Sequence, residues 1–174
     1  MVGVKESIRA GNLEQVKARL QPFRCDDNCA WAAYWGHLHI LQWLHAQDPN
    51  CKYARGICSY AAPNGHLHVL QWARAQVPPF PWSETTCTWA TFSAHFHFLK
   101  WARAQVPPCP WRPADRRLFI AQNKRYRVFK WLRESEHVEL DPNVLQWMAQ
   151  VDEAVAQVST SSDIHSLVKE FVDM

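Results

Sequence analysis

The stretch GHLHVLQW (65–72) occurs three times in nearly the same form. It stands as GHLHILQW at 36–43 and as AHFHFLKW at 94–101, at equal spacing before and after it. The tryptophans that end these copies are followed by a fourth, Trp131, after a step of nearly the same length. Self-similarity with a period of about 30 residues is typical of repeat proteins, in which each unit buries its apolar face against its neighbours.

Each unit is predicted to be a pair of helices. In the third copy, CTWATFS (87–93) precedes a turn at Ala94, and HFHFLKWARAQ (95–105) carries a broad apolar face at helical spacing. The paired prolines of VPPFPW (77–82) and VPPCPW (106–111) cannot continue the second helix. Ser83 and Pro113 are suitable residues to start the helices that follow. The predicted unit is therefore helix, tight turn, helix and proline-rich loop.

These residues resemble ankyrin repeats, in the divergent form P-W-x-x-x-T-C-x-x-A-A-x-x-G-H-L-x-V-L-x-W-A-R found in giant DNA viruses and in some algae and oomycetes. The matching columns are Pro81-Trp82, Thr86-Cys87, Ala61-Ala62, Gly65-His66-Leu67 and Leu70-Gln71-Trp72-Ala73-Arg74. The units are shorter than the usual ~33 residues and lack the TPLH signature. The resemblance implies an all-α, ankyrin-like helical repeat solenoid with shortened loops and helical caps.

The resemblance covers roughly residues 8–134. We expect an N-terminal capping repeat over 1–24, ankyrin-like repeats over 25–134, and C-terminal capping or docking helices over 135–174. Asp141-Pro142 begins a helix whose apolar residues are spaced by four and three, and STSSD (159–163) ends it. A final amphipathic helix follows, and the sequence leaves open whether it caps the array or docks on another subunit.

The repeated His-x-His raises the question of a metal site. Residues two apart on a regular helix point about 200° from each other, so these pairs are not expected to converge on one ion. In the family that the chain resembles, the His after the turn residue hydrogen-bonds the neighbouring turn. We therefore predict no bound metal and no cofactor.

The six cysteines fall largely into repeat columns. One column holds Cys29, Cys58 and Cys87, and a second holds Cys51 and Cys109 with Phe80 between them. A position that accepts Phe behaves as an apolar pocket, and neighbours within a column lie one repeat apart, beyond the ~7 Å Cα limit for a disulfide. Cys25 lies outside these columns. All six are expected to be buried or half-buried thiols in a reducing compartment.

Catalytic patterns are absent from the sequence. The five glycines form neither GxGxxG nor a Walker A loop, and neither G-x-S-x-G nor H-E-x-x-H occurs. We therefore predict that the chain is not an enzyme.

The aromatic columns are expected to pack in the two helix layers. They are Trp43, Trp72, Trp101 and Trp131 in the second helices, and Trp31, Tyr60 and Trp89 in the first helices. In ankyrin arrays, partners bind the loops and the exposed face of the first helix. The resemblance thus implies a contact surface of Asn50, Tyr53, Arg55, Pro79, Trp82, Glu84, Pro108 and Trp111. Alternatively, Trp82 and Trp111 cover the seam between repeats.

A second candidate surface is basic. Residues 112–133 hold eight Lys or Arg and one Asp, whereas residues 134–174 hold one Lys and nine acidic residues. The candidate contacts are Arg112, Arg116, Arg117, Lys124, Arg125 and Arg127. Interleaved aromatic residues make nucleic-acid binding one interpretation, but docking of an acidic partner or of the chain's own acidic tail is the favoured one.

These observations predict a non-enzymatic protein–protein interaction module that acts as an adaptor or scaffold. The alternative is a structural accessory or linker subunit of a large assembly, such as a capsid or an organellar or photosynthetic complex. A nucleic-acid binder that uses the basic face comes third. No run approaches ~18 apolar residues, and the N-terminus lacks the apolar region of a secretory signal. We expect an intracellular protein, soluble or assembly-bound, with no membrane insertion.

Overall fold

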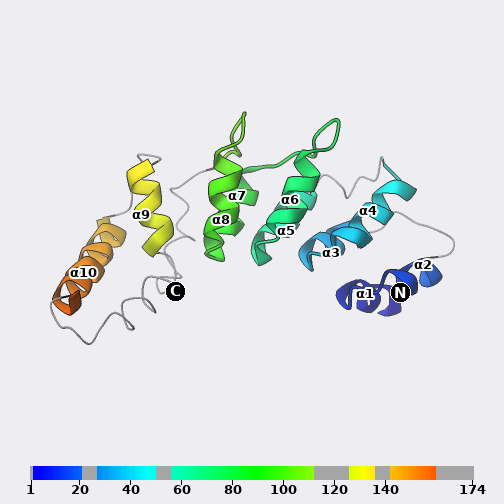
Figure 1. Cartoon of the computed structure of the whole chain (residues 1–174), viewed down its shortest axis with the longest axis horizontal. Helices are drawn as coiled ribbons and strands as arrows, with labels where there is room; N and C mark the ends of the chain where they lie inside the picture. Colours follow the sequence, from blue (N-terminus) through cyan, green and yellow to red (C-terminus); the bar gives the residue numbers. More distant parts are fainter. Residues whose placement is uncertain (1, 21–26, 50–55, 112–125, 136–141, 160–174) are drawn as a thin grey trace. The chain divides into compact units, whose positions relative to one another are not determined.

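The computed structural model describes residues 2–20, 27–49, 56–111, 126–135 and 142–159. Within these ranges the chain is helical and contains no strand, which confirms the predicted all-α class (Figure 1). The chain forms two compact units, residues 1–111 and 112–174. This division lies inside the range 25–134 that the sequence assigns to repeats, and the predicted domain boundaries stay predictions.

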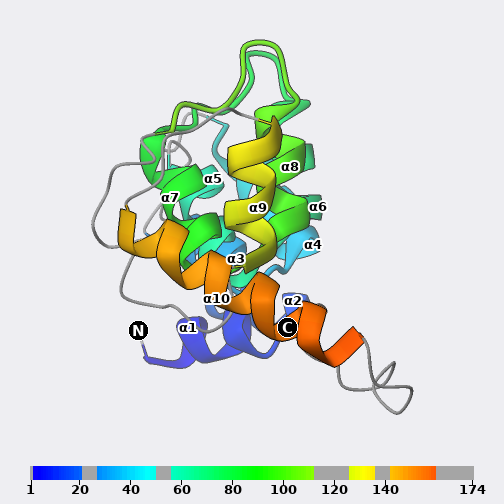
Figure 2. The same cartoon turned by 90° about the vertical axis from the view of Figure 1, so that its left-hand side faces the viewer.

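The first unit contains a series of helix pairs. Its elements are α1 (Val2–Arg9), α2 (Leu13–Arg19), α3 (Asn28–Tyr34), α4 (Leu38–Gln47), α5 (Ile57–Ala61) with the 3-10 turn η2 (Ala62–Asn64), α6 (Leu67–Arg74), α7 (Glu84–Phe92) and α8 (Phe96–Arg103). Consecutive helices pack in pairs, and the first helices contact one another in the order α1, α3, α5, α7. Figure 2 shows α4, α6 and α8 on one side of the unit and α3, α5 and α7 on the other.

The turn within each pair has one recurring geometry. The turn residues Gly11, Gly36, Gly65 and Ala94 all have positive φ, between 59° and 75°. At Gly65 the turn N–H donates to Ala62, and the next N–H donates to Ala61, five residues back. This is the Schellman arrangement, which requires a left-handed residue after the helix and satisfies the last carbonyls. The other three turns have the same two hydrogen bonds, so a left-handed residue, which is glycine in three of the four turns, defines this geometry.

The core lies between the two layers and follows the repeat columns. From the second helices it takes large apolar side chains, with Ile40, Leu41, Val69, Leu70, Phe98 and Leu99 all fully or almost fully buried. From the first helices it takes small residues such as Ala32, Ala61 and Ala90. Full burial of each Leu or Ile contributes about 1.5–3 kcal/mol. The small residues allow the first helices of successive units to approach closely.

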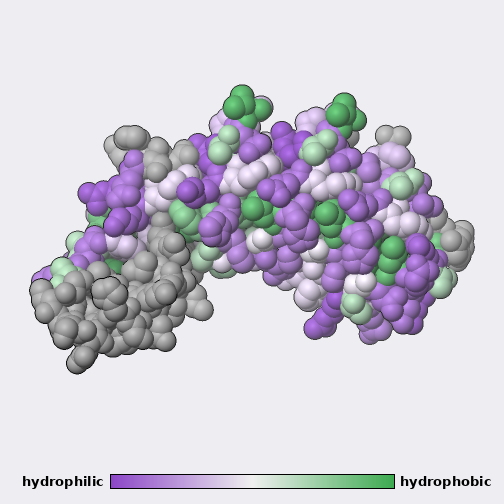
Figure 3. All heavy atoms as spheres, viewed as in Figure 1, coloured by the Kyte–Doolittle hydropathy of each residue, from purple (hydrophilic) through white to green (hydrophobic). Residues whose placement is uncertain are grey.

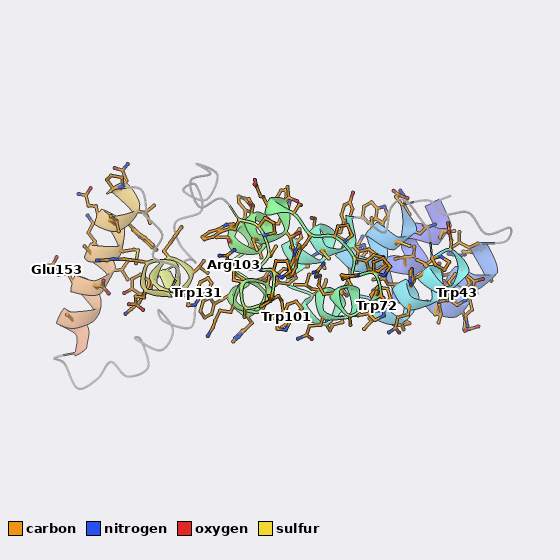
Figure 4. All side chains as sticks on the ribbon, turned by 90° about the horizontal axis from the view of Figure 1, so that it is seen from above. Trp43, Trp72, Trp101, Arg103, Trp131 and Glu153 are labelled. Carbon is orange, nitrogen blue, oxygen red and sulfur yellow. The ribbon has the colours of Figure 1, made fainter. Side chains whose placement is uncertain are left out.

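In one predicted aromatic column, Trp31 is half-buried but the other two members lie outside the core. Tyr60 and Trp89 are 46% and 45% exposed, so the expectation that they pack inside the first-helix layer is wrong. The alanine that follows each of them is fully buried, and a step of one residue turns a helical side chain by about 100°. The alanines therefore occupy the core side of these helices, and the aromatic rings point away from it. The other column, Trp43, Trp72 and Trp101, is half-buried along the second helices (Figure 4).

The second unit contains α9 (Tyr126–Ser135) and α10 (Pro142–Ser159). Among the residues described there, Val128, Phe129, Val144 and Met148 are buried. The rings of Tyr126 and Phe129 each stand edge-on to Trp147, with centroids 6.3 Å away, and the Tyr126 hydroxyl donates to Asp152. Helix α10 confirms the predicted helix that begins at Asp141-Pro142, whereas its predicted end within 159–163 and the predicted final helix extend beyond the described residues.

Candidate functional site

The first histidine of each His-x-His hydrogen-bonds the preceding helix pair. The Nε2 of His37, His66 and His95 lies 3.1, 3.0 and 2.9 Å from the carbonyl oxygens of Arg9, Tyr34 and Pro63. Because a carbonyl only accepts, each Nε2 must carry the proton and donate. These three residues therefore link successive units, the structural role that the ankyrin resemblance implied.

The second histidine hydrogen-bonds the same neighbouring turn. His39 and His68 reach the carbonyls of Gly11 and Gly36, at 3.0 and 2.9 Å. Within each pair the ring centroids are only 5.9 and 5.7 Å apart, so the prediction that the two rings point away from each other is wrong. His37 and His66 occupy the N-cap positions of α4 and α6, with ψ of 76° and 73°. The regular-helix geometry therefore does not apply to them.

Both rings of the first two pairs, and the first ring of the third, thus lie on backbone carbonyls at the seam. In the part of the chain that the structure describes, no group of three or more His, Cys, Asp or Glu side chains is placed to hold a metal ion. Burial lowers the pKa of His66, which favours the neutral ring that the seam contains.

The loops that follow α6 and α8 project from the helical layers and end in exposed valines. Val77 is 98% exposed and Val106 is 97% exposed, and Pro79 and Pro108 beside them are exposed as well. Both Val–Pro peptide bonds are cis. Figure 1 shows the two loops side by side, and Figure 3 shows an apolar tip on each.

The base of each loop is firmly anchored. The Phe80 N–H donates to Ala73, and the Cys109 N–H donates to Ala102, both at 3.0 Å. An arginine also holds the end of each loop. Arg74 donates to the Phe80 carbonyl and Arg103 donates to the Cys109 carbonyl, both at 2.7 Å. The two loops are therefore equivalent, pre-organised projections one repeat apart.

The predicted contact residues around these loops differ in exposure. Trp82 and Trp111 are half-buried, and the Arg74 guanidinium lies over the Trp82 ring, 4.0 Å from its centroid. Glu84 is the first residue of α7 and is half-buried. Pro79 and Pro108 are thus the most open of the predicted contacts that the structure describes.

The remaining predicted contacts cannot be placed. Outside the described residues lie Asn50, Tyr53, Arg55, Arg112, Arg116, Arg117, Lys124 and Arg125, and Arg127 belongs to α9 with its side chain undescribed.

Sequence reasoning missed two exposed apolar groups. The first is the pair Val77 and Val106, which stand one repeat apart in identical Ala-Gln-Val-Pro-Pro segments. The second is an aromatic group on the first helices α5 and α7, where Tyr60, Trp89 and the 40% exposed Phe92 lie. In the sequence, the sign that these rings are exposed was the alanine directly after Tyr60 and after Trp89. That alanine faces the core, so the ring before it does not.

The described cysteines are buried and free, as predicted. Cys29, Cys58, Cys87 and Cys109 form no disulfide. Burial raises the pKa of Cys29 to about 11 and that of Cys58 to about 12. In contrast, the pKa of Cys109 is lowered by a hydrogen bond from the Cys87 side chain. Sequence reasoning compared positions within one column and missed this contact between two columns.

The chain matches no protein-family model, no curated protein and no solved structure. Among the described helices, none combines the length and the apolar character needed to cross a bilayer.

Proposed function

We propose that the chain is a non-enzymatic protein–protein interaction module, built as an ankyrin-like helical repeat solenoid, that acts as an adaptor or scaffold. The observation that carries this proposal is the pair of anchored loops with almost fully exposed tips at Val77 and Val106. Exposed apolar groups that gather in one region commonly mark interaction sites. A loop held in its bound shape also loses little conformational entropy on binding.

The first helices support the same proposal. Tyr60 and Trp89 occupy equivalent positions on α5 and α7, which contact each other, and Phe92 packs edge-on against Trp89 with centroids 5.7 Å apart. Aromatic side chains are the usual anchors of protein interfaces. The loops and the exposed face of the first helix are also the surfaces that ankyrin arrays use.

A structural subunit of a large assembly is the second candidate. The exposed rings of Tyr60, Trp89 and Phe92 favour it, because permanent interfaces are more apolar than transient ones. Affinity capture of the tagged chain from its native source, at low and at high salt, separates the two candidates. A stoichiometric, salt-resistant assembly supports the structural subunit, and substoichiometric partners that salt removes support the adaptor.

The role of the loops is tested by a charge placed on each tip. Val77→Asp with Val106→Asp should abolish capture of the partners, because a carboxylate is costly to bury in an apolar contact. The matched control is Gln42→Asp with Gln71→Asp, which adds the same charge at exposed positions of α4 and α6. Capture that survives in the loop variant, or that is lost equally in the control, would contradict the proposal.

A further inference from the structure

Two buried thiols meet where the loop after α8 returns to the start of α7. Cys87 lies in α7, Cys109 lies in the returning segment, and both are fully buried. The Cys109 thiol donates to the carbonyl of Ser83, the N-cap residue of α7, at 3.7 Å. The side chain of Cys87 hydrogen-bonds the Cys109 thiol. The backbone of Cys109 is fixed on both sides, through its N–H to Ala102 and its carbonyl to Arg103.

The preceding unit shows that this thiol pair is not needed to build the fold. Its equivalent of Cys87 is Cys58, and its equivalent of Cys109 is Phe80, at the same separation along the chain. The Cys58 thiol reaches the Phe80 carbonyl at 3.9 Å. The returning segments of both units make the same backbone and arginine hydrogen bonds, and of these two units only the later one has a second cysteine at this position.

We propose that Cys87 and Cys109 form a redox-active dithiol that a hydroperoxide oxidises to an intrachain disulfide. The inference stands apart from the proposed function, since it needs no partner protein. Of the two cysteines, Cys109 has the environment suited to attack the peroxide. The hydrogen bond from Cys87 lowers its pKa, the Cys87 N–H and the charges of Arg103 and Arg74 act in the same direction, and burial opposes them. A thiolate stabilised in this way is the form that reacts with peroxides.

The reaction proceeds in two balanced steps. The Cys109 thiolate attacks one peroxide oxygen, the O–O bond breaks, and the products are a sulfenic acid on Cys109 and the alcohol or water derived from the peroxide. The Cys87 sulfur then attacks the sulfenic sulfur, and the S–O oxygen leaves as water with the thiol proton. The two electrons removed from the dithiol reduce the hydroperoxide.

The disulfide changes how the projecting loop is held. Before oxidation the return of the loop rests on hydrogen bonds, and afterwards it is covalently joined to α7 next to the exposed tip at Val106. Both thiols are buried, so a peroxide reaches them only when the hydrogen bonds of Cys109 to Ala102 and Arg103 break and the returning segment opens locally. The flanking residues Pro108 and Pro110 are exposed, which makes this segment the accessible side of the pair.

The test is mass spectrometry of the full chain after treatment with hydrogen peroxide and alkylation of the remaining thiols. Cleavage at Lys100 and Arg103 separates Cys87 from Cys109, and cleavage at Arg74 separates Cys58 from both. A cross-linked peptide that joins Cys87 to Cys109, with Cys58 recovered in the alkylated form, supports the proposal. Separate alkylation of Cys87 and Cys109, or disulfides that involve Cys58 equally, would overturn it.

Three variants test the pairing and the order of attack. In Cys87→Ser, Cys109 should accumulate a sulfenic acid that dimedone traps. In Cys109→Phe, which installs the residue of the preceding unit, Cys87 should remain a thiol. Phe80→Cys should transfer the chemistry and yield a cross-link between Cys58 and position 80. Far-UV circular dichroism checks folding, and a folded Cys87→Ser chain whose Cys109 is labelled no more than Cys58 contradicts the proposal.

Discussion

A methyl group added to Gly36 would lie 2.5 Å from ring atoms of His66, on a backbone whose φ is +75°. The left-handed conformation alone costs a non-glycine residue about 1–2 kcal/mol, and the ring is held in place by its hydrogen bond to Tyr34. We therefore expect Gly36→Ala to lower the free energy of unfolding by about 2 kcal/mol or more, measured by urea denaturation.

Two further substitutions provide controls for Gly36. Gly3 lies in α1, and its added methyl would meet only the guanidinium end of the exposed Arg19, at 3.2 Å, so Gly3→Ala should change stability by less than about 1 kcal/mol. Ala94 already has the left-handed conformation, with φ of 59°. Ala94→Gly should therefore stabilise the chain by about 0.5–1 kcal/mol. If Gly36→Ala leaves the free energy of unfolding unchanged, the seam between the helix pairs can shift to accept a methyl group.

The seam histidines predict a dependence of stability on pH. Burial lowers the pKa of His66 below its ordinary value of 6.5, the hydrogen bond to Tyr34 opposes this, and charges on His68, His95 and His37 add to it. The unfolded chain then binds this proton more readily than the folded chain. The free energy of unfolding should fall as the pH drops through 6.5, and the fall should continue down to the folded pKa.

Urea denaturation at about pH 7.5 and about pH 5.5 measures this dependence. In His66→Gln the amide can still donate to the Tyr34 carbonyl but does not titrate. The loss of stability on acidification should therefore be smaller in this variant than in the native chain. An equal loss in both proteins would assign the effect to other groups.

At the scale of elements, the sequence predicted the positions of the turns and helix ends well. Small residue pairs followed by glycine provide a Schellman turn, and paired prolines end a helix, because both depend on local backbone chemistry. The direction in which side chains point was less predictable. Repeat columns establish which residues are equivalent, but they do not show which side of the helix faces the core. Tyr60 and Trp89 are exposed for this reason, and the Cys87–Cys109 contact joins two different columns.

The return of each loop depends on the arginine near the end of the second helix. Arg74 donates to Phe80 at 2.7 Å, and its guanidinium covers Trp82 at 4.0 Å. Lysine cannot reproduce a planar group that stacks and donates at once. We expect Arg74→Lys to lower the free energy of unfolding by about 1 kcal/mol, measured by thermal or urea denaturation.

A matched control and a double-mutant cycle test this interpretation of Arg74. Arg9 is exposed and lies over Trp35 at 5.1 Å, so Arg9→Lys should cost less than about 0.5 kcal/mol. In the cycle, Arg74→Lys and Trp82→Ala should be less than additive, because the two residues share one contact. Simple additivity would separate Trp82 from the arginine and strengthen its assignment as a partner contact.

For the whole molecule, the first compact unit contains every histidine seam that the structure describes. Residues 1–111 hold the helices from α1 to α8 and the core between their two layers. Repeat arrays are stabilised by contacts between neighbouring units, so a set of successive helix pairs can fold without the rest of the chain. We therefore expect a fragment of residues 1–111 to be helical and to unfold cooperatively, as followed by far-UV circular dichroism in urea.

A shorter fragment, residues 1–93, provides the comparison because it keeps α7 and removes α8. Phe98 and Leu99 of α8 are almost completely buried, so the loss of this helix uncovers the apolar side of α7 and of its neighbours. The shorter fragment should show a lower urea midpoint and less helix per residue than the 1–111 fragment. If the 1–111 fragment is itself unfolded or aggregated, the array requires residues 112–174 as a cap, and the second unit then has a structural rather than a docking role.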